Sequence, residues 1–247
     1  MEKEAVVKVV IPSHKRAGRV TTLQVVPQAI LCVEESQAEE YRKAYPGVEL
    51  LIHPDSVAGL PRKRDWIYRA AGNVLMLDDD ISAMMRLYTE PGERAEVYPD
   101  EAWDIIQSTA AAALDAGVFL WGFNSNPNPM MYTSPSPIKL TGYITGCATG
   151  LLAGSKLFYN PAIVCNEDYW ISLLNAHYHR MIWKDMRFTF IQKDTFKNPG
   201  GLAEFRNLDR EKIDFDLLRR YFGDAVELRK TTGKMKHPYQ KMMRVGF

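Results

Sequence analysis

The chain has 247 residues, of which 46% are hydrophobic and 25% charged, and its formal net charge is +1. This composition is ordinary for a globular protein, and the balanced charge argues against a chain that is basic throughout, so only local charge could attract a nucleic acid. The three cysteines are odd in number and lack a C-x-x-C pair, which argues against a disulfide framework or a zinc knuckle.

Strand and helix patterns alternate through the first hundred residues. Apolar, β-branched runs predict strands at residues 5–11, 29–34, 48–53 and 73–77. Helices are predicted at residues 60–71 and at residues 36–45, the latter with Ser36 as N-cap. This alternation is typical of a parallel sheet with right-handed crossovers, so we expect an α/β fold in which residues 1–100 bind a nucleotide.

The second half of the chain mixes strand types. Helices are predicted at residues 101–116 (with Asp100 as N-cap), 168–180 and 209–222. Strands are predicted at residues 118–123 and 187–192, a strand or hairpin at residues 142–153, and a proline-rich loop at residues 124–137. No linker or repeat divides the chain. We therefore expect one domain over residues 1–247, with an acceptor half at 101–205 and a C-terminal helix and basic tail at 206–247.

Three consecutive aspartates, Asp78, Asp79 and Asp80, follow directly on an apolar run that predicts a buried strand, central in a parallel sheet. Their carboxylates repel one another unless a positive charge lies nearby, and Mg²⁺ and Mn²⁺ take carboxylate oxygens. Because alternate residues of a strand share a face, we expect Asp80 to bind a metal ion and Asp78 to bind the metal ion or the nucleotide ribose, while Asp79 points away or caps the next turn. A solvated, aspartate-rich turn is the alternative.

Three cations, Arg62, Lys63 and Arg64, open the predicted helix at residues 60–71. Positive charge at a helix N-terminus opposes the macrodipole, so a bound anion would explain its presence. Arg62 and Arg64 can each fork onto phosphoryl oxygens. For any one of these residues, a solvated basic turn is the alternative.

Polar residues also follow the first two predicted strands. Ligands of open α/β sheets bind outside the carboxyl ends of strands, so the loop after the first strand is a candidate to contact a base or a phosphate. Glu34 ends the second strand and is placed to accept a hydrogen bond from a ribose or a base. A strand-end carboxylate without a ligand role is the alternative. The candidate donor-binding residues are Pro12, Ser13, Arg16, Glu34, Arg62, Arg64, Asp78 and Asp79.

A second acidic site, Asn166-Glu167-Asp168, opens another predicted helix. Asn166 is a suitable N-cap, and acids in a first turn suit the helix dipole, which alone could explain both carboxylates. The functional alternative makes Asp168, with Glu167 as the second candidate, a general base that takes a proton from a hydroxyl acceptor.

The tail from Arg229 is rich in lysine and arginine and poor in acidic residues. Such a tail can bind the backbone phosphates of a nucleic acid, although basic tails are more often merely solvated. His237 in this tail is a candidate third metal ligand, with an isolated surface histidine as the alternative. Four aromatic side chains on the expected acceptor side are candidates to stack on a base or a sugar: Trp121, Tyr132, Tyr143 and Trp170.

Four strings in this order resemble a glycosyltransferase of the GT-A type, in its family-2-like branch: VVIPSHKR, ILCVEES, GLPRKRDWIYRAAGNVLMLDDDI and NEDYW. The resemblance implies a mostly parallel central sheet flanked by helices, with a smaller mixed acceptor-side region. It also implies a UDP-sugar or other nucleotide-sugar donor, with Mn²⁺ or Mg²⁺ on its diphosphate. By position, Asp78 and Asp80 match the family's D-x-D, Arg64 the arginine before that strand, and Asp168 the catalytic base.

Within that branch, the compact length and the strings GLPRKRDW and LMLDDDI are similar to those of phage glycosyltransferases associated with TET/JBP-type oxygenases. This resemblance implies a metal-dependent hexosyltransferase acting on 5-hydroxymethylcytosine or a related hydroxymethyl base, with DNA engaged through the basic tail and the target base flipped out. No apolar run reaches the length of a membrane span, so we expect a cytoplasmic protein (in the host, if phage-encoded) with no membrane partner. The alternatives are a glycan, lipid or protein acceptor, or a sugar-nucleotide nucleotidyltransferase.

Overall fold

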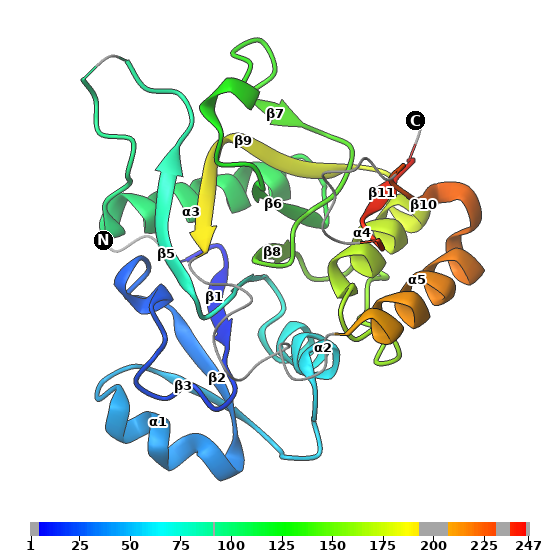
Figure 1. The fold of residues 1–247 in the computed structure, drawn as a ribbon. Helices are drawn as coiled ribbons and strands as arrows, with labels where there is room; N and C mark the ends of the chain where they lie inside the picture. The colour runs from blue at the N-terminus through cyan, green and yellow to red at the C-terminus, as the bar shows by residue number, and fades with distance from the viewer. Residues whose placement is uncertain (1–4, 91, 193–206, 231–237, 246–247) are drawn as a thin grey trace.

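A mixed sheet of nine strands forms the centre of the fold (Figure 1). The structure, a computed structural model, describes residues 5–90, 92–192, 207–230 and 238–245. The strands of the central sheet are β1 (Lys8–Pro12), β2 (Ile30–Glu34), β3 (Leu50–His53), β4 (Val74–Leu77), β5 (Ile81–Arg86), β6 (Leu120–Asn124), β7 (Ile138–Lys139), β8 (Ala148–Leu151) and β9 (Ile182–Gln192). They lie in the order β3-β2-β1-β4-β8-β6-β9-β5, and β7 also pairs with β9.

Helices cover both faces of this sheet. The helices are α1 (Ala38–Ala44), α2 (Leu60–Ala71), α3 (Pro99–Asp115), α4 (Glu167–Tyr178) and α5 (Leu208–Phe222). α1 and α3 pack on one face, and α2 and α4 pack on the other, with α5 against α4 (Figure 1). The buried strand β4 packs against the helices on both faces of the sheet. Leu75 and Leu77 point to the face covered by α1 and α3, and Val74 and Met76 point to the face covered by α2 and α4. Among the described residues, no helix is both long and apolar enough to cross a membrane.

The aspartate-bearing strand is central, as predicted, but its two neighbours differ in direction. β4 pairs in parallel with β1, which continues in parallel to β2, and β2 to β3. On its other side β4 pairs antiparallel with β8. Beyond β8, β6 and β9 are parallel to each other, whereas β5 and β7 run antiparallel to β9. The parallel part therefore brings the carboxyl ends of β1, β2 and β4 to one edge of the sheet.

Two predicted helix starts are corrected by the structure. A 3₁₀ turn occupies Glu35–Gln37, and α1 begins only at Ala38, so Ser36 is not its N-cap. α3 begins at Pro99, because proline suits the first helical turn, where its missing N–H leaves no bond unmade. Asp100 therefore lies inside the first turn of α3 and not at the cap.

The C-terminal region packs against the start of α4. Asn166 occupies the N-cap position, but its side chain makes no capping bond; its Nδ2 donates instead to Glu211 and Asp214 of α5. Lys241 Nζ lies 2.8 Å from Glu211 Oε2, and both side chains are buried. Lys241 begins β11 (Lys241–Met243), which pairs antiparallel with β10 (Val226–Leu228), so part of the basic tail forms a strand.

Candidate active site

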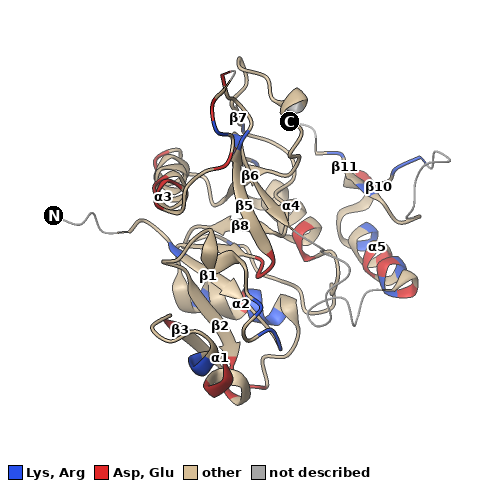
Figure 2. Ribbon diagram, turned by 60° about the vertical axis from the view of Figure 1, so that its left-hand side comes forward, with Lys and Arg blue, Asp and Glu red and all other residues tan. Residues whose placement is uncertain are grey.

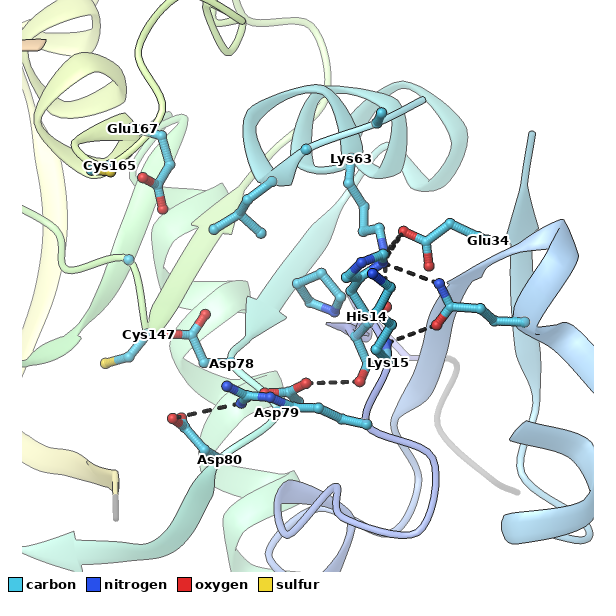
Figure 3. A pocket seen from close by; sticks show the side chains of 18 of the residues that line it. His14, Lys15, Glu34, Lys63, Asp78, Asp79, Asp80, Cys147, Cys165 and Glu167 are labelled. Carbon is cyan, nitrogen blue, oxygen red and sulfur yellow. Dashed lines mark hydrogen bonds and ion pairs between the residues drawn. The ribbon is translucent and has the colours of Figure 1, made fainter. Parts of the chain in front are cut away.

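A cavity of about 640 Å³ lies at the edge of the sheet where β1, β2 and β4 end (Figure 3). Its walls come from the loops after these strands, from the start of α2, from the start of α4 and from the end of β9. The lining residues are Pro12, Ser13, His14, Lys15, Arg16, Glu34, Ser36, Gln37, Asp55, Ala58, Gly59, Leu60, Lys63, Asp78, Asp79, Asp80, Thr145, Gly146, Cys147, Cys165, Glu167, Asp168 and Gln192. The structure therefore brings the two acidic sites and the loops after the first two strands into one space.

Asp78 and Asp80 share one hydrogen-bond donor. Gln192 Nε2 donates to Asp78 Oδ2 at 3.0 Å and to Asp80 Oδ1 at 2.8 Å. Burial raises the pKa of Asp78 to about 7; Arg64 opposes this shift, and the carboxylates of Asp80 and Asp79 add to it. A divalent cation would relieve this repulsion, and carboxylate oxygens are its preferred donors, so the side chains present fit Mg²⁺ or Mn²⁺.

Asp79 points away from this pair, although β4 ends at Leu77 and the three aspartates lie in the turn after it. Its Oδ1 accepts from Arg16 Nη1 at 2.5 Å, and its Oδ2 accepts from the Ser13 hydroxyl at 2.7 Å. Asp79 therefore fixes the loop after β1 at the cavity wall. With Asp79 turned aside, no three His, Cys, Asp or Glu side chains within the described ranges form a metal-binding group.

The three cations at the start of α2 have three different environments. Arg64 is fully buried, donates from Nη2 to Asp78 Oδ1 at 2.8 Å, and places Nε 3.7 Å from Glu167 Oε1. Lys63 is buried and lines the cavity, whereas Arg62 is exposed and lies outside the lining. Figure 2 shows the acidic turn after β4 beside the basic start of α2.

These positions separate the two arginines that the sequence proposes as phosphate ligands, and phosphate binding by either of them stays a prediction. Arg62 faces solvent, and Arg64 is a counter-ion buried behind Asp78, because the inner face of α2 carries Lys63, Arg64, Ile67 and Tyr68. Of the three cations, Lys63 is the one that reaches the cavity lining.

Replacing Arg64 with methionine should lower the free energy of unfolding by about 3–5 kcal/mol, since Arg64 is buried and is the cation that pairs with the half-buried Asp78 carboxylate. Arg62→Met removes the same charge from an exposed position of the same helix turn and should change stability by less than about 0.5 kcal/mol. Urea unfolding of both variants tests this difference. Equal, small effects would show that Arg64 does not neutralise Asp78 and Glu167.

Glu34 lies among cations and imidazoles at the opposite side of the cavity from Glu167 (Figure 3). Its Oε1 lies 2.8 Å from Lys63 Nζ and 2.9 Å from His14 Nδ1. Burial alone would raise the pKa of Glu34, but the hydrogen bond and the charge of Lys63 outweigh it, so the pKa lies below its usual value. Its Oε2 is buried and has no hydrogen-bond partner among the described residues.

The start of α4 presents two acids in different environments. Glu167 is buried, and this burial raises its pKa to about 8 although the charge of Arg64 opposes the shift. Asp168 is half-buried, and its Oδ2 accepts from the Tyr143 hydroxyl and, at 3.3 Å, from the Gly146 N–H. Burial and the charge of Asp168 hold the pKa of Tyr143 well above its usual value, so the phenol keeps its proton and orients the carboxylate. Asp168 is therefore better placed than Glu167 to meet an acceptor.

Stability of the metal-free protein should fall as the pH rises from about 5 to 8. Glu167 holds a proton up to about pH 8 when folded, against an ordinary pKa of 4.5, so the folded state binds more protons than the unfolded chain in this range. The contribution of Glu167 to the free energy of unfolding is fully present below the pKa of the unfolded chain. It is lost as the pH rises through the pKa of the folded state. Glu167→Gln should flatten the decline, which urea unfolding across this range in EDTA measures. An identical pH profile in the variant would contradict the assignment.

Two of the four candidate stacking residues are core residues. The exposed fractions of Trp121 and Trp170 are 0% and 3%, because their rings fill the two apolar layers that flank the sheet. The prediction that these two rings stack on a base or a sugar is therefore wrong. Tyr143 contributes through its hydroxyl, which donates to Asp168. His237 lies outside the described residues.

Comparisons with known proteins give consistent relatives. A family described as TET-Associated Glycosyltransferase matches residues 7–201. A Beta-glucosyl-HMC-alpha-glucosyl-transferase of Enterobacteria phage T6 is 22% identical over 266 residues, which cover 94% of this chain and 89% of that protein. Among solved structures, S. aureus TarS 1-349 is similar with a TM-score of 0.46 and 11% identity, over 87% of this chain and 71% of that one.

The family match spans the whole central sheet from β1 to β9 and every residue that lines the cavity. It confirms the resemblance predicted from the four sequence strings and, together with the sheet and its flanking helices, the α/β fold of the GT-A type. It also confirms that the protein is a glycosyltransferase. The chain belongs to the TET-associated glycosyltransferase family.

Proposed function

We propose that this glycosyltransferase uses a divalent metal ion to move a sugar from a nucleotide-diphospho-sugar, most simply a UDP-sugar, to a hydroxymethyl base in DNA. One observation carries the proposal. A single cavity holds a carboxylate pair suited to a metal ion, a polar end suited to a nucleoside, and a carboxylate suited to deprotonating an acceptor.

The nucleoside end is the region around Glu34. The unpartnered, buried Oε2 of Glu34 requires a donor, which a ribose hydroxyl or a base N–H can supply. Lys63 Nζ donates to the Ser13 carbonyl at 2.7 Å and contacts the Glu34 carboxylate, so it links the loop after β1 to the end of β2. The positions of Glu34 and Ser13 are thus set before the donor arrives, which reduces the ordering cost of binding.

The metal end is the region of Asp78 and Asp80. Mn²⁺ or Mg²⁺ held there would neutralise charge on the departing diphosphate. Arg64 is buried behind Asp78 and fixes that carboxylate at 2.8 Å. The chain therefore holds carboxylate oxygens of Asp78 and Asp80 in place for a metal ion. The charge of Arg64 reduces the electrostatic cost of keeping the Asp78 carboxylate at the cavity wall.

The acceptor end is the region of Asp168. The acceptor hydroxyl oxygen would bond to the anomeric carbon while the bond from that carbon to the diphosphate oxygen breaks, and Asp168 would take the hydroxyl proton. Tyr143 and the Gly146 N–H hold the carboxylate for this step. Glu167, buried against Arg64, would support the arrangement from behind.

DNA is proposed as the acceptor on the strength of the family and of one relative. The phage T6 relative is named for transfer to a glucosylated HMC, and its match covers 94% of this chain. A hydroxymethyl group on a duplex base would have to leave the stack to reach a cavity of this depth, so base flipping is part of the proposal.

The test is to incubate the protein with Mn²⁺, a panel of radiolabelled nucleotide-sugars and matched DNAs containing either 5-hydroxymethylcytosine or cytosine. After digestion to nucleosides, label should migrate with the modified hydroxymethylcytidine and be absent from the cytosine DNA. Label found only on added glycan, lipid or protein would refute the DNA acceptor. Release of pyrophosphate without sugar transfer would indicate a nucleotidyltransferase.

A further inference from the structure

Gln192 lies at the end of β9 and lines the cavity beside the aspartates. The antiparallel pairing of β5 and β9 sets Ile81 opposite Gln192, which brings the end of β9 next to the turn that follows β4 (Figure 1). Gln192 is more than a hundred residues from Asp78 in sequence, so this neighbour arises only from the sheet topology. Its side chain is half-buried and directed at Asp78 and Asp80.

The distances from the Gln192 amide to Asp78 and Asp80 fit those between neighbouring ligands of a bound Mg²⁺ ion. Magnesium–oxygen bonds of roughly 2.0–2.1 Å in an octahedron separate adjacent ligand oxygens by about 2.9 Å. The amide nitrogen of Gln192 lies 3.0 Å from Asp78 Oδ2 and 2.8 Å from Asp80 Oδ1, which matches two edges of such a cage. Rotating the terminal amide exchanges its nitrogen and oxygen, which differ little in size and shape.

We propose that Gln192 is a protein ligand of the divalent cation held by Asp78 and Asp80, through its side-chain carbonyl oxygen. The inference rests on the proposed metal-dependent function and assigns a residue to it. In the metal-free protein the amide donates to both carboxylates and reduces their repulsion; with the cation bound it turns and presents Oε1. Amide carbonyl oxygens suit hard cations, and a neutral ligand leaves charge on the metal to act on a diphosphate.

A competing role has the opposite consequence. If the amide only fills the space of the cation, metal binding must break its two hydrogen bonds, and removing the amide should tighten metal binding. If the amide becomes a ligand, removing it should weaken binding. The sign of the change in metal affinity therefore decides between the two roles.

The first experiment measures the affinity for Mn²⁺ alone by electron paramagnetic resonance in the wild type and in Gln192→Met, which keeps the side-chain length. We expect the dissociation constant to rise at least about tenfold, the scale set by outer partners of metal ligands. Gln107→Met is the matched control: Gln107 is also half-buried and hydrogen-bonded, with Nε2 3.0 Å from the Val7 carbonyl, but lies outside the cavity. An unchanged or lower dissociation constant in Gln192→Met would overturn the proposal.

The second experiment tests direct contact and does not depend on the methionine variant folding. Gln192→Glu keeps an oxygen at the same place and should bind Mn²⁺ at least as tightly as the wild type. Gln192→His should add directly bound nitrogen to the pulsed resonance spectrum of Mn²⁺, whereas Gln107→His should not. Loss of Mn²⁺ binding in the glutamate variant, or a histidine spectrum identical to that of the wild type, would refute ligation by position 192.

The metal-binding experiments and the transfer assay test the ligand role of Gln192 and the proposed DNA acceptor separately. Should wild-type protein bind no Mn²⁺ while still transferring sugar to DNA, the ligand role of Gln192 is wrong and the acceptor proposal stands. Should Mn²⁺ bind through Gln192 while no transfer to DNA occurs, the ligand role stands and the acceptor is wrong.

Discussion

Replacing Asp80 with alanine should reduce the rate of sugar transfer by at least about a hundredfold, the scale of removing one preorganised charge stabiliser. Asp80 faces the cavity beside Asp78, and the two carboxylates share the Gln192 amide at 2.8 Å and 3.0 Å. Arg16 Nη1 lies 3.9 Å from the other oxygen of Asp80, so a weak ion pair is also lost. The measurement is the initial rate of label transfer at saturating donor and Mn²⁺.

The control for this variant is Asp104→Ala, which removes an exposed carboxylate of α3 outside the cavity. It should transfer sugar at the wild-type rate. Near-normal turnover of Asp80→Ala with added Mn²⁺ would contradict a metal role for the aspartate pair. A folded variant that has lost both Mn²⁺ affinity and activity would support it, with folding checked by circular dichroism.

Replacing Asp168 with asparagine should abolish detectable transfer while leaving donor affinity intact. General base catalysis contributes roughly 10²–10⁴-fold, and an amide cannot take the acceptor proton. Asparagine preserves the shape of the side chain and can still accept from Tyr143 and Gly146, which now hold the Asp168 carboxylate. Donor binding should survive because the nucleoside end around Glu34 lies across the cavity from the start of α4 (Figure 3).

The matched control for Asp168→Asn is Asp209→Asn. Asp209 is an exposed acid in the first turn of α5, outside the cavity, so this variant changes a helix-start charge without touching the site. It should retain transfer. Calorimetric loss of donor binding in Asp168→Asn would indicate that the residue supports the helix start, and would remove it from the chemistry.

Much of the fold of residues 1–100 could be predicted because its signals are local. The runs that form β1, β2 and β4 are apolar and β-branched, and the carboxyl ends of parallel strands must meet at one edge, so the loops after them were expected to share a site. Asp79 turns toward Ser13 and Arg16, away from Asp78 and Asp80, but strand geometry is not the cause, because β4 ends at Leu77 and the three aspartates lie in the turn after it.

The features that were missed depend on contacts between distant parts of the chain. β5, with the sequence ISAMMR, lacks a β-branched run and exists because β9 pairs with it. Gln192 acquires its position from that same pairing, so no local pattern around it indicates the cavity. The opening turn of α4 likewise is held by Glu211 and Asp214, which lie more than forty residues away.

The burial of Arg64 had a signal that the prediction did not use. In α2, Ile67 and Tyr68 form the apolar face, and residues 63 and 64 lie one turn earlier on that face, whereas Arg62 does not. Helical periodicity therefore separates the cations of α2 into inner and outer ones. What it cannot give is the partner, Asp78, which directly follows β4 and accepts from Arg64 at 2.8 Å.

The most direct test of this account is whether donor binding depends on metal through the aspartate pair. Calorimetric titration of a nucleotide-sugar into wild-type protein should show binding with Mn²⁺ and binding weaker by at least about tenfold in EDTA, since one inner partner of a metal site is worth that much. Asp80→Ala should bind the donor with equal weakness in both conditions. Equal donor affinity of the wild type with Mn²⁺ and in EDTA would contradict the account.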